Sequence, residues 1–133
     1  MTFADLVAQF AAAIEALGAD AVVVGHGIGG LVAQVLVNRG AVAAGAALHS
    51  ASPRATFPVS RRAWRLFGGR ASASSSLALS FEDFSAFIGN ALPPDQQAAV
   101  FDRYIAPGAP RVAREARSVG ASIDFAKPHP PFC

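Results

Sequence analysis

Apolar residues recur at three- and four-residue intervals along the first segment of the chain, which is the period of a helix with one buried face. These positions are Phe3, Leu6, Val7, Phe10, Ile14 and Leu17. Thr2 and Asp5 have the spacing of a capping box, and Gly18 is a typical residue for the end of a helix. The pattern therefore predicts an amphipathic helix over residues 3–17.

The following segment, AVVVGHGIGGLVAQVLV over residues 21–37, is apolar and uncharged. Its β-branched beginning, residues 22–24, predicts a short strand that is buried on both faces, as in the centre of a parallel sheet. A helix is expected from Ile28 to Arg39, and VAAGAALHS over residues 42–50 predicts a second buried strand. Strand, helix and strand in this order predict a βαβ unit, so the expected fold class is α/β.

The same uncharged run is almost long enough to cross a membrane as a single helix. His26, Gln34 and the clustered glycines between them favour a strand and a separate helix instead. The N-terminal segment also lacks the pattern of a signal peptide, because Asp5 and Glu15 interrupt its apolar run. We therefore expect no membrane association and a cytoplasmic location.

Beyond Ser50 the sequence predicts a small helical layer. A Pro-punctuated connection leads to a short helix, RRAWRLFGG, and then to a polar loop, RASASSS. Ser80 predicts the start of a Phe-rich helix, Pro94 predicts the start of the next, and a short helix and a Pro-rich tail follow. The expected domains are therefore residues 1–53, the core, and residues 54–133, the helical region and tail.

Composition narrows the possible functions. The chain of 133 residues is 53% hydrophobic and 15% charged, which suits a folded core rather than a disordered chain. Its net charge is +2, and the one basic and aromatic cluster is formed by Arg61, Arg62 and Arg65 around Trp64. We interpret this cluster as a solvated helix face and expect no nucleic-acid partner. The single cysteine, Cys133, excludes an internal disulfide and zinc-binding cysteine spacing, and we expect no metal or cofactor.

The turn between the first strand and its helix, GHGIGG, allows several interpretations. Gly25, Gly27 and Gly30 match the GxGxxG pattern that binds the pyrophosphate of a dinucleotide at a helix N-terminus. Such a site also needs an acidic residue about twenty positions later, and none occurs between Asp20 and Glu82. Alternatively, the glycines only permit a tight turn and close packing.

A further interpretation rests on a resemblance. The sequence GHGIGGLVA resembles the G-H-S-x-G-G-x-x-A nucleophile elbow of the α/β hydrolases, with Gly27 at the position of the nucleophilic serine. The helix that ends in ALGAD and the segment AVAAGAALHSASP are similar to the flanking parts of that family. The segment LSFEDFSAFIGNALPPDQQAAVFDRYIAPGAPR is similar to the helical lid of a lid-bearing subgroup. The resemblance implies a partial α/β-hydrolase fold with a small helical lid.

In this family the elbow serine attacks the substrate, a histidine activates the serine, and an acid orients the histidine. The resemblance assigns the backbone amide of Ile28 to the oxyanion hole and packs His26 beneath the turn. The second oxyanion donor, the acid and the catalytic histidine are expected outside this chain. Asp124 and His129 have the right order, but they lie five residues apart in the tail, too close for two separate strand-end loops.

The resemblance implies a parental activity, the hydrolysis of ester-like small apolar substrates through an acyl-enzyme. This chain is expected to lack that activity because Gly27 has no hydroxyl group. The alternative is a non-catalytic protein that binds a small apolar ligand in a pocket near His49, Phe84 and Phe87, under the lid. Because the family's sheet is larger, both edges of the sheet in this chain are expected to be open and hydrophobic, which favours self-association.

Overall fold

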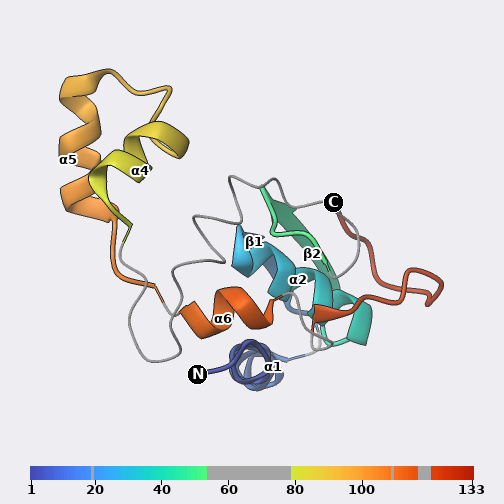
Figure 1. The fold of residues 1–133 in the computed structure, drawn as a ribbon. Helices are drawn as coiled ribbons and strands as arrows, with labels where there is room; N and C mark the ends of the chain where they lie inside the picture. Colours follow the sequence, from blue (N-terminus) through green and yellow to red (C-terminus); the bar gives the residue numbers. More distant parts are fainter. Residues whose placement is uncertain (19, 54–78, 109, 117–120) are drawn as a thin grey trace. The chain divides into compact units, whose positions relative to one another are not determined.

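The structure is a computed structural model that describes residues 1–18, 20–53, 79–108, 110–116 and 121–133. Within these residues it contains helices and a small parallel sheet (Figure 1). The helix expected for RRAWRLFGG and its arginine cluster lie outside the described residues. None of the described helices combines the length and the hydropathy needed to cross a membrane.

Contacts group the chain into two units, residues 1–59 with 111–133 and residues 60–110. The C-terminal segment therefore belongs with the first unit, whereas the domains expected from the sequence joined it to the helical region. The physical reason is packing, because Val112 and Ala116 are buried in the core of the first unit.

Helix α1 (Phe3–Leu17) begins and ends where the sequence predicts. The Thr2 hydroxyl accepts a hydrogen bond from the Asp5 N–H at 2.9 Å, and the Asp5 carboxylate accepts one from the Thr2 N–H at 2.8 Å. These bonds complete the capping box and lower the pKa of Asp5. Gly18 ends the helix with a positive φ of 97°.

Helix α6 (Pro110–Glu115) is tied to the start of α1 by the Glu115 carboxylate. One carboxylate oxygen accepts a hydrogen bond from the Phe3 N–H at 3.1 Å, and the other accepts one from Arg111 Nε at 2.7 Å. The hydrogen bond from Arg111 lowers the pKa of Glu115 and raises that of Arg111. The negative charge also faces the positive end of the α1 dipole, which favours this docking.

Strands β1 (Val22–His26) and β2 (Ala44–Leu48) form a parallel pair. Helix α2 (Ile28–Arg39) connects them, and Gly40 ends this helix in the left-handed conformation. The uncharged run that begins at Ala21 is therefore a strand followed by a helix, as the sequence predicts.

The C-terminal tail pairs with the outer edge of β2. The Gly45 N–H donates to the Pro131 carbonyl at 3.0 Å, the Cys133 N–H donates to the Gly45 carbonyl at 3.1 Å, and the Ala47 N–H donates to the Cys133 carbonyl at 2.8 Å. Gly45 and Phe132 form a parallel bridge between the two segments. The expectation that both sheet edges are open is therefore wrong for β2, because the tail takes up its backbone hydrogen bonds.

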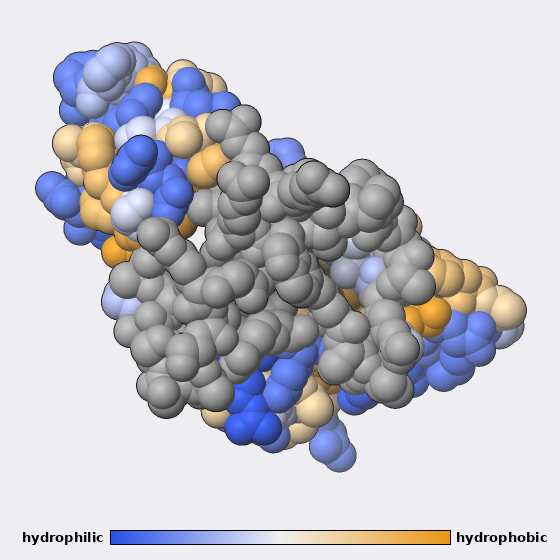
Figure 2. Space-filling view, viewed as in Figure 1, coloured by the Kyte–Doolittle hydropathy of each residue, from blue (hydrophilic) through white to orange (hydrophobic). Residues whose placement is uncertain are grey.

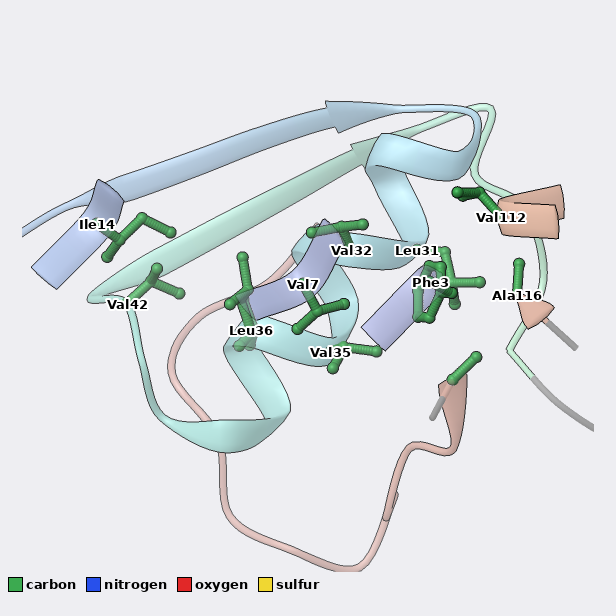
Figure 3. Close-up of a cluster of buried hydrophobic side chains, with 12 residues drawn as sticks. Phe3, Val7, Ile14, Leu31, Val32, Val35, Leu36, Val42, Val112 and Ala116 are labelled. Carbon is green, nitrogen blue, oxygen red and sulfur yellow. The ribbon is translucent and has the colours of Figure 1, made fainter. Parts of the chain in front are cut away.

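One face of the sheet is covered and the other is open. Side chains of α1, α2 and α6, together with Val42 before β2 and Ala116 after α6, form a core on the covered face (Figure 3). Its members include Phe3, Val7, Ile14, Leu31, Val32, Val35, Leu36, Val42, Val112 and Ala116. Val22 and Val24 point to the opposite face and are 65% and 64% exposed. The prediction that the first strand is buried on both faces is therefore wrong, because the described helices of this unit cover only one face.

The second unit contains helices α4 (Phe81–Phe87) and α5 (Pro94–Tyr104). Helix α4 begins after Ser80, whose hydroxyl caps it as the sequence predicts. Phe84 is buried, and its ring centroid lies 5.5 Å from that of Phe101. No residue of α5 is buried, and Figure 2 shows hydrophobic residues among hydrophilic ones on the surface of this unit, at the upper left.

Candidate functional site

The chain passes from β1 into α2 through a single residue, Gly27, in an unusual conformation. Gly27 has a φ of 58° and a ψ of −120°. A residue with a side chain adopts such angles only under strain, which costs about 1–3 kcal/mol. Glycine avoids that cost because it has no Cβ. Gly27 therefore allows the strand to turn sharply into the helix without strain.

Two neighbouring glycines are required by close packing. A Cβ on Gly25 would collide with the backbone of Gly29 and lie 2.6 Å from the nitrogen of Gly30. A Cβ on Gly30 would lie 2.8 Å from the Cβ of Ser50. In contrast, a Cβ on Gly27 would have no atom within 4 Å. The tip of the turn thus has room for a side chain, although none is present.

Hydrogen bonds hold this turn against the residues that follow β2. The Gly27 N–H donates to the Leu48 carbonyl at 3.1 Å, and the Gly27 carbonyl accepts from the Ala51 N–H at 2.8 Å. On α2, Gln34 Nε2 donates to Ser50 Oγ at 2.6 Å, and the Ser50 hydroxyl donates to the Ala51 carbonyl at 2.8 Å. The proton of the Ser50 hydroxyl is therefore engaged with the backbone, which disfavours its use as a nucleophile.

Two histidines flank the turn at the ends of the two strands. The rings of His26 and His49 form an edge-to-face pair with centroids 6.0 Å apart. Both residues are exposed, so His26 does not pack beneath the turn as the resemblance implied. Its position follows from strand alternation, which puts it on the open face of the sheet together with Val24. His49 has a φ of 43°, a left-handed conformation that is uncommon for a residue with a side chain.

The N-terminus of α2 lies directly at the turn. Because the helix begins at Ile28, the N–H groups of its first turn have no acceptor within the helix. Gly27 provides no side-chain cap, and the first turn contains no acidic residue. The positive end of the helix dipole is therefore not neutralised by a side chain of this turn. The amide of Ile28 is the group that the resemblance assigns to the oxyanion hole.

The residues expected to line a pocket under the lid belong to different units. His49 lies in the first unit, whereas Phe84 and Phe87 lie in the second. Phe84 is 1% exposed and packs within its own unit, and Phe87 is half-buried. A pocket that joins these three residues remains a prediction from the sequence.

Asp124 and His129 line one pocket in the first unit. The carboxylate of Asp124 accepts a hydrogen bond from the Ala126 N–H at 3.0 Å, and His129 Nδ1 lies 2.8 Å from the Pro130 carbonyl. Each side chain is thus bonded to nearby tail backbone. These hydrogen bonds organise the tail and do not form a catalytic pair.

Among the residues that the structure describes, no group of three or more His, Cys, Asp and Glu side chains could hold a metal ion. No family model, curated protein or solved structure matches the chain. The turn between β1 and α2 is therefore the feature of the described residues that bears most on function.

Proposed function

We propose that the chain contains the nucleophile elbow of a lid-bearing α/β hydrolase in which glycine replaces the serine, and that it does not cleave esters through an acyl-enzyme. The observation that carries the proposal is the conformation of Gly27. Its backbone angles would strain any residue with a side chain, and it lies between a parallel strand and the helix that follows it. This is the setting in which a nucleophile elbow presents its side chain at the tip of a sharp turn.

The packing of the turn supports the same proposal. An elbow needs close contact between its strand and helix, together with free space around the nucleophile. Gly25 and Gly30 have no room for a Cβ, whereas Gly27 has open space around it. A simple tight turn would not require this combination. In this proposal the amide of Ile28, at the positive end of α2, would be one oxyanion donor next to position 27.

The chemistry explains why the chain is inactive in this proposal. An acyl-enzyme needs a side-chain oxygen or sulfur atom that attacks the substrate carbonyl, and Gly27 has neither. The nearby Ser50 hydroxyl donates its proton to the Ala51 carbonyl and accepts a hydrogen bond from Gln34. Stabilisation of an oxyanion by backbone amides alone does not form the covalent intermediate.

The second unit fits the lid in this proposal. It is a separate compact unit, and its two described helices share an aromatic cluster that contains Phe81, Phe84 and Phe101. Such a helical unit would provide an apolar cover for ester-like small substrates in the active relatives that the resemblance implies.

Labelling with a fluorophosphonate tests the proposal. We expect no adduct by intact-mass analysis of the wild-type chain and no burst of product from p-nitrophenyl acetate. A stoichiometric adduct that is lost in the Ser50→Ala variant would overturn the proposal, because it would identify a working nucleophile after β2, beside the turn.

A further inference from the structure

The pocket that Asp124 and His129 line lies away from the tip of the turn, where the C-terminal tail meets α2. Its volume is about 120 Å³. The walls are mainly apolar and come from Val37 on α2 and from Ile123, Phe125 and Phe132 on the tail. Pockets that bind small molecules are typically concave and apolar with a few polar groups, and this one has that character.

The tail that forms one wall is anchored at both ends. At one end, the Asn38 side chain donates to the Asp124 carbonyl at 2.8 Å and accepts from the Asp124 N–H at 3.2 Å. At the other end, Phe132 lies in the segment that pairs with β2, opposite Gly45. The two aromatic rings, Phe125 and Phe132, therefore lie on a segment that is held in place before any ligand binds.

The polar groups of the pocket select the charge and the hydrogen-bonding capacity of a ligand. Because the Pro130 carbonyl can only accept, His129 Nδ1 carries the proton of this 2.8 Å hydrogen bond. In the neutral ring, Nε2 is then a hydrogen-bond acceptor, which favours a ligand that has a donor group. Asp124 also lines the pocket, and none of the lining residues that the structure describes is Lys or Arg, so an anion is disfavoured.

We propose that this pocket binds a small neutral aromatic molecule with one hydroxyl donor, of the phenol class. The ring would lie between Phe125 and Phe132, and the hydroxyl would donate to His129 Nε2. The pocket is somewhat smaller than the apolar cavity of about 150 Å³ that is known to bind benzene, but it opens to solvent, so part of the ligand can remain outside it. The proposal is independent of the elbow, since the site uses the other end of α2 and the tail.

Titration of the full-length chain with phenol, followed by two-dimensional amide NMR, tests the proposal. We expect saturable shifts for residues 121–133 and for the C-terminal half of α2. Phe125→Ala and Phe132→Ala each remove one aromatic wall and are expected to weaken binding roughly tenfold. Phe10→Ala is the matched control, because Phe10 is also a partly exposed Phe but lies on α1 outside the pocket. Its affinity for phenol should equal that of the wild type.

The choice of ligand tests the role of His129. Phenol should bind more tightly than toluene, and benzoate should bind most weakly. His129→Phe keeps an aromatic ring but removes the acceptor, so the preference for phenol over toluene should fall roughly fivefold. The proposal is overturned if phenol gives no saturable shift up to its solubility. It would also be overturned if Phe125→Ala and Phe10→Ala lost the same affinity for phenol. An unchanged preference for phenol over toluene in His129→Phe would overturn it as well.

Discussion

The four glycines of the turn should differ sharply in their tolerance of alanine, because their surroundings differ. At position 25, the added Cβ meets backbone atoms of α2, and one of them, the nitrogen of Gly30, is only 2.6 Å away. Backbone atoms cannot rotate away as a side chain can, so β1 and α2 would have to separate. Overpacking of this kind costs about 3 kcal/mol or more in the free energy of unfolding. Gly25→Ala should therefore be the most damaging of the four variants.

The other three positions differ in what an added methyl group would meet. In Gly30→Ala, the new methyl group would lie 2.8 Å from Ser50 Cβ, and Ser50 is held by Gln34, so we expect a loss of about 1–3 kcal/mol. Gly27→Ala meets no atoms but keeps a φ of 58°, so only backbone strain of about 1–3 kcal/mol applies. Gly29→Ala has open space within a helix and should be neutral or stabilise by up to about 1 kcal/mol.

Urea unfolding of the full-length chain, followed by circular dichroism, measures these differences. Gly29→Ala is the internal control, since it adds the same methyl group within the same turn. If Gly25→Ala were as stable as Gly29→Ala, the close approach of β1 and α2 would be absent in solution. The structural basis of the elbow would then be refuted.

Two further predictions concern the first unit. The hydrogen bond from Arg111 lowers the pKa of Glu115 from its ordinary value of 4.5. The contact therefore stabilises the folded state fully above pH 4.5, and this stabilisation is lost as the pH falls through the lowered folded-state pKa. Glu115→Gln should therefore flatten the decrease in urea midpoint between about pH 6 and about pH 2, and parallel curves for variant and wild type would contradict this. The open sheet face around Val24 should cause self-association, which Val24→Lys should reduce in sedimentation velocity while the melting temperature stays similar. A wild type that remains monomeric at high concentration would contradict the second prediction.

Local signals in the sequence were sufficient to predict the helices and the position of the turn. The capping box at Thr2, the glycines at the ends of α1 and α2, and the cap at Ser80 each depend on residues within a few positions of one another. The β-branched run at Val22 likewise located β1, because strand propensity is carried by the same few residues. These elements could be predicted because their stabilising contacts are local.

Long-range contacts could not be predicted in the same way. The pairing of the tail with β2 joins Gly45 to Phe132, and no local pattern marks a Pro-rich tail as an edge strand. The open sheet face was not predicted because apolar residues such as Val22 and Val24 are typical of a buried face. The strand sequence alone does not show whether another element covers that face. His49 has a left-handed φ between Leu48 and Ala51, the two residues that form hydrogen bonds with Gly27. Because those bonds join residues that are distant in the sequence, no local pattern predicts this conformation.

Residue 27 would need to meet two requirements, one of the backbone and one of catalysis, and glycine meets only the first. The backbone of the turn between β1 and α2 requires a residue that tolerates a positive φ, and glycine does so at the lowest cost. The catalytic function requires a nucleophilic side chain at the same residue, which glycine cannot supply. The proposed loss of activity therefore does not require any loss of the local fold.

Alkylation of a thiol placed at the tip of the turn tests whether residue 27 occupies the position of a nucleophile. Gly27→Cys would be compared with Gly40→Cys, in a Cys133→Ser background that removes the free cysteine. Gly40 is a matched position, because it also has a positive φ and open space but lies at the opposite end of α2. We expect iodoacetamide to react roughly tenfold faster at position 27 near neutral pH, since the N-terminus of α2 stabilises a thiolate there. Equal rates, or a slower reaction at position 27, would contradict the claim that Gly27 occupies the position of a nucleophile.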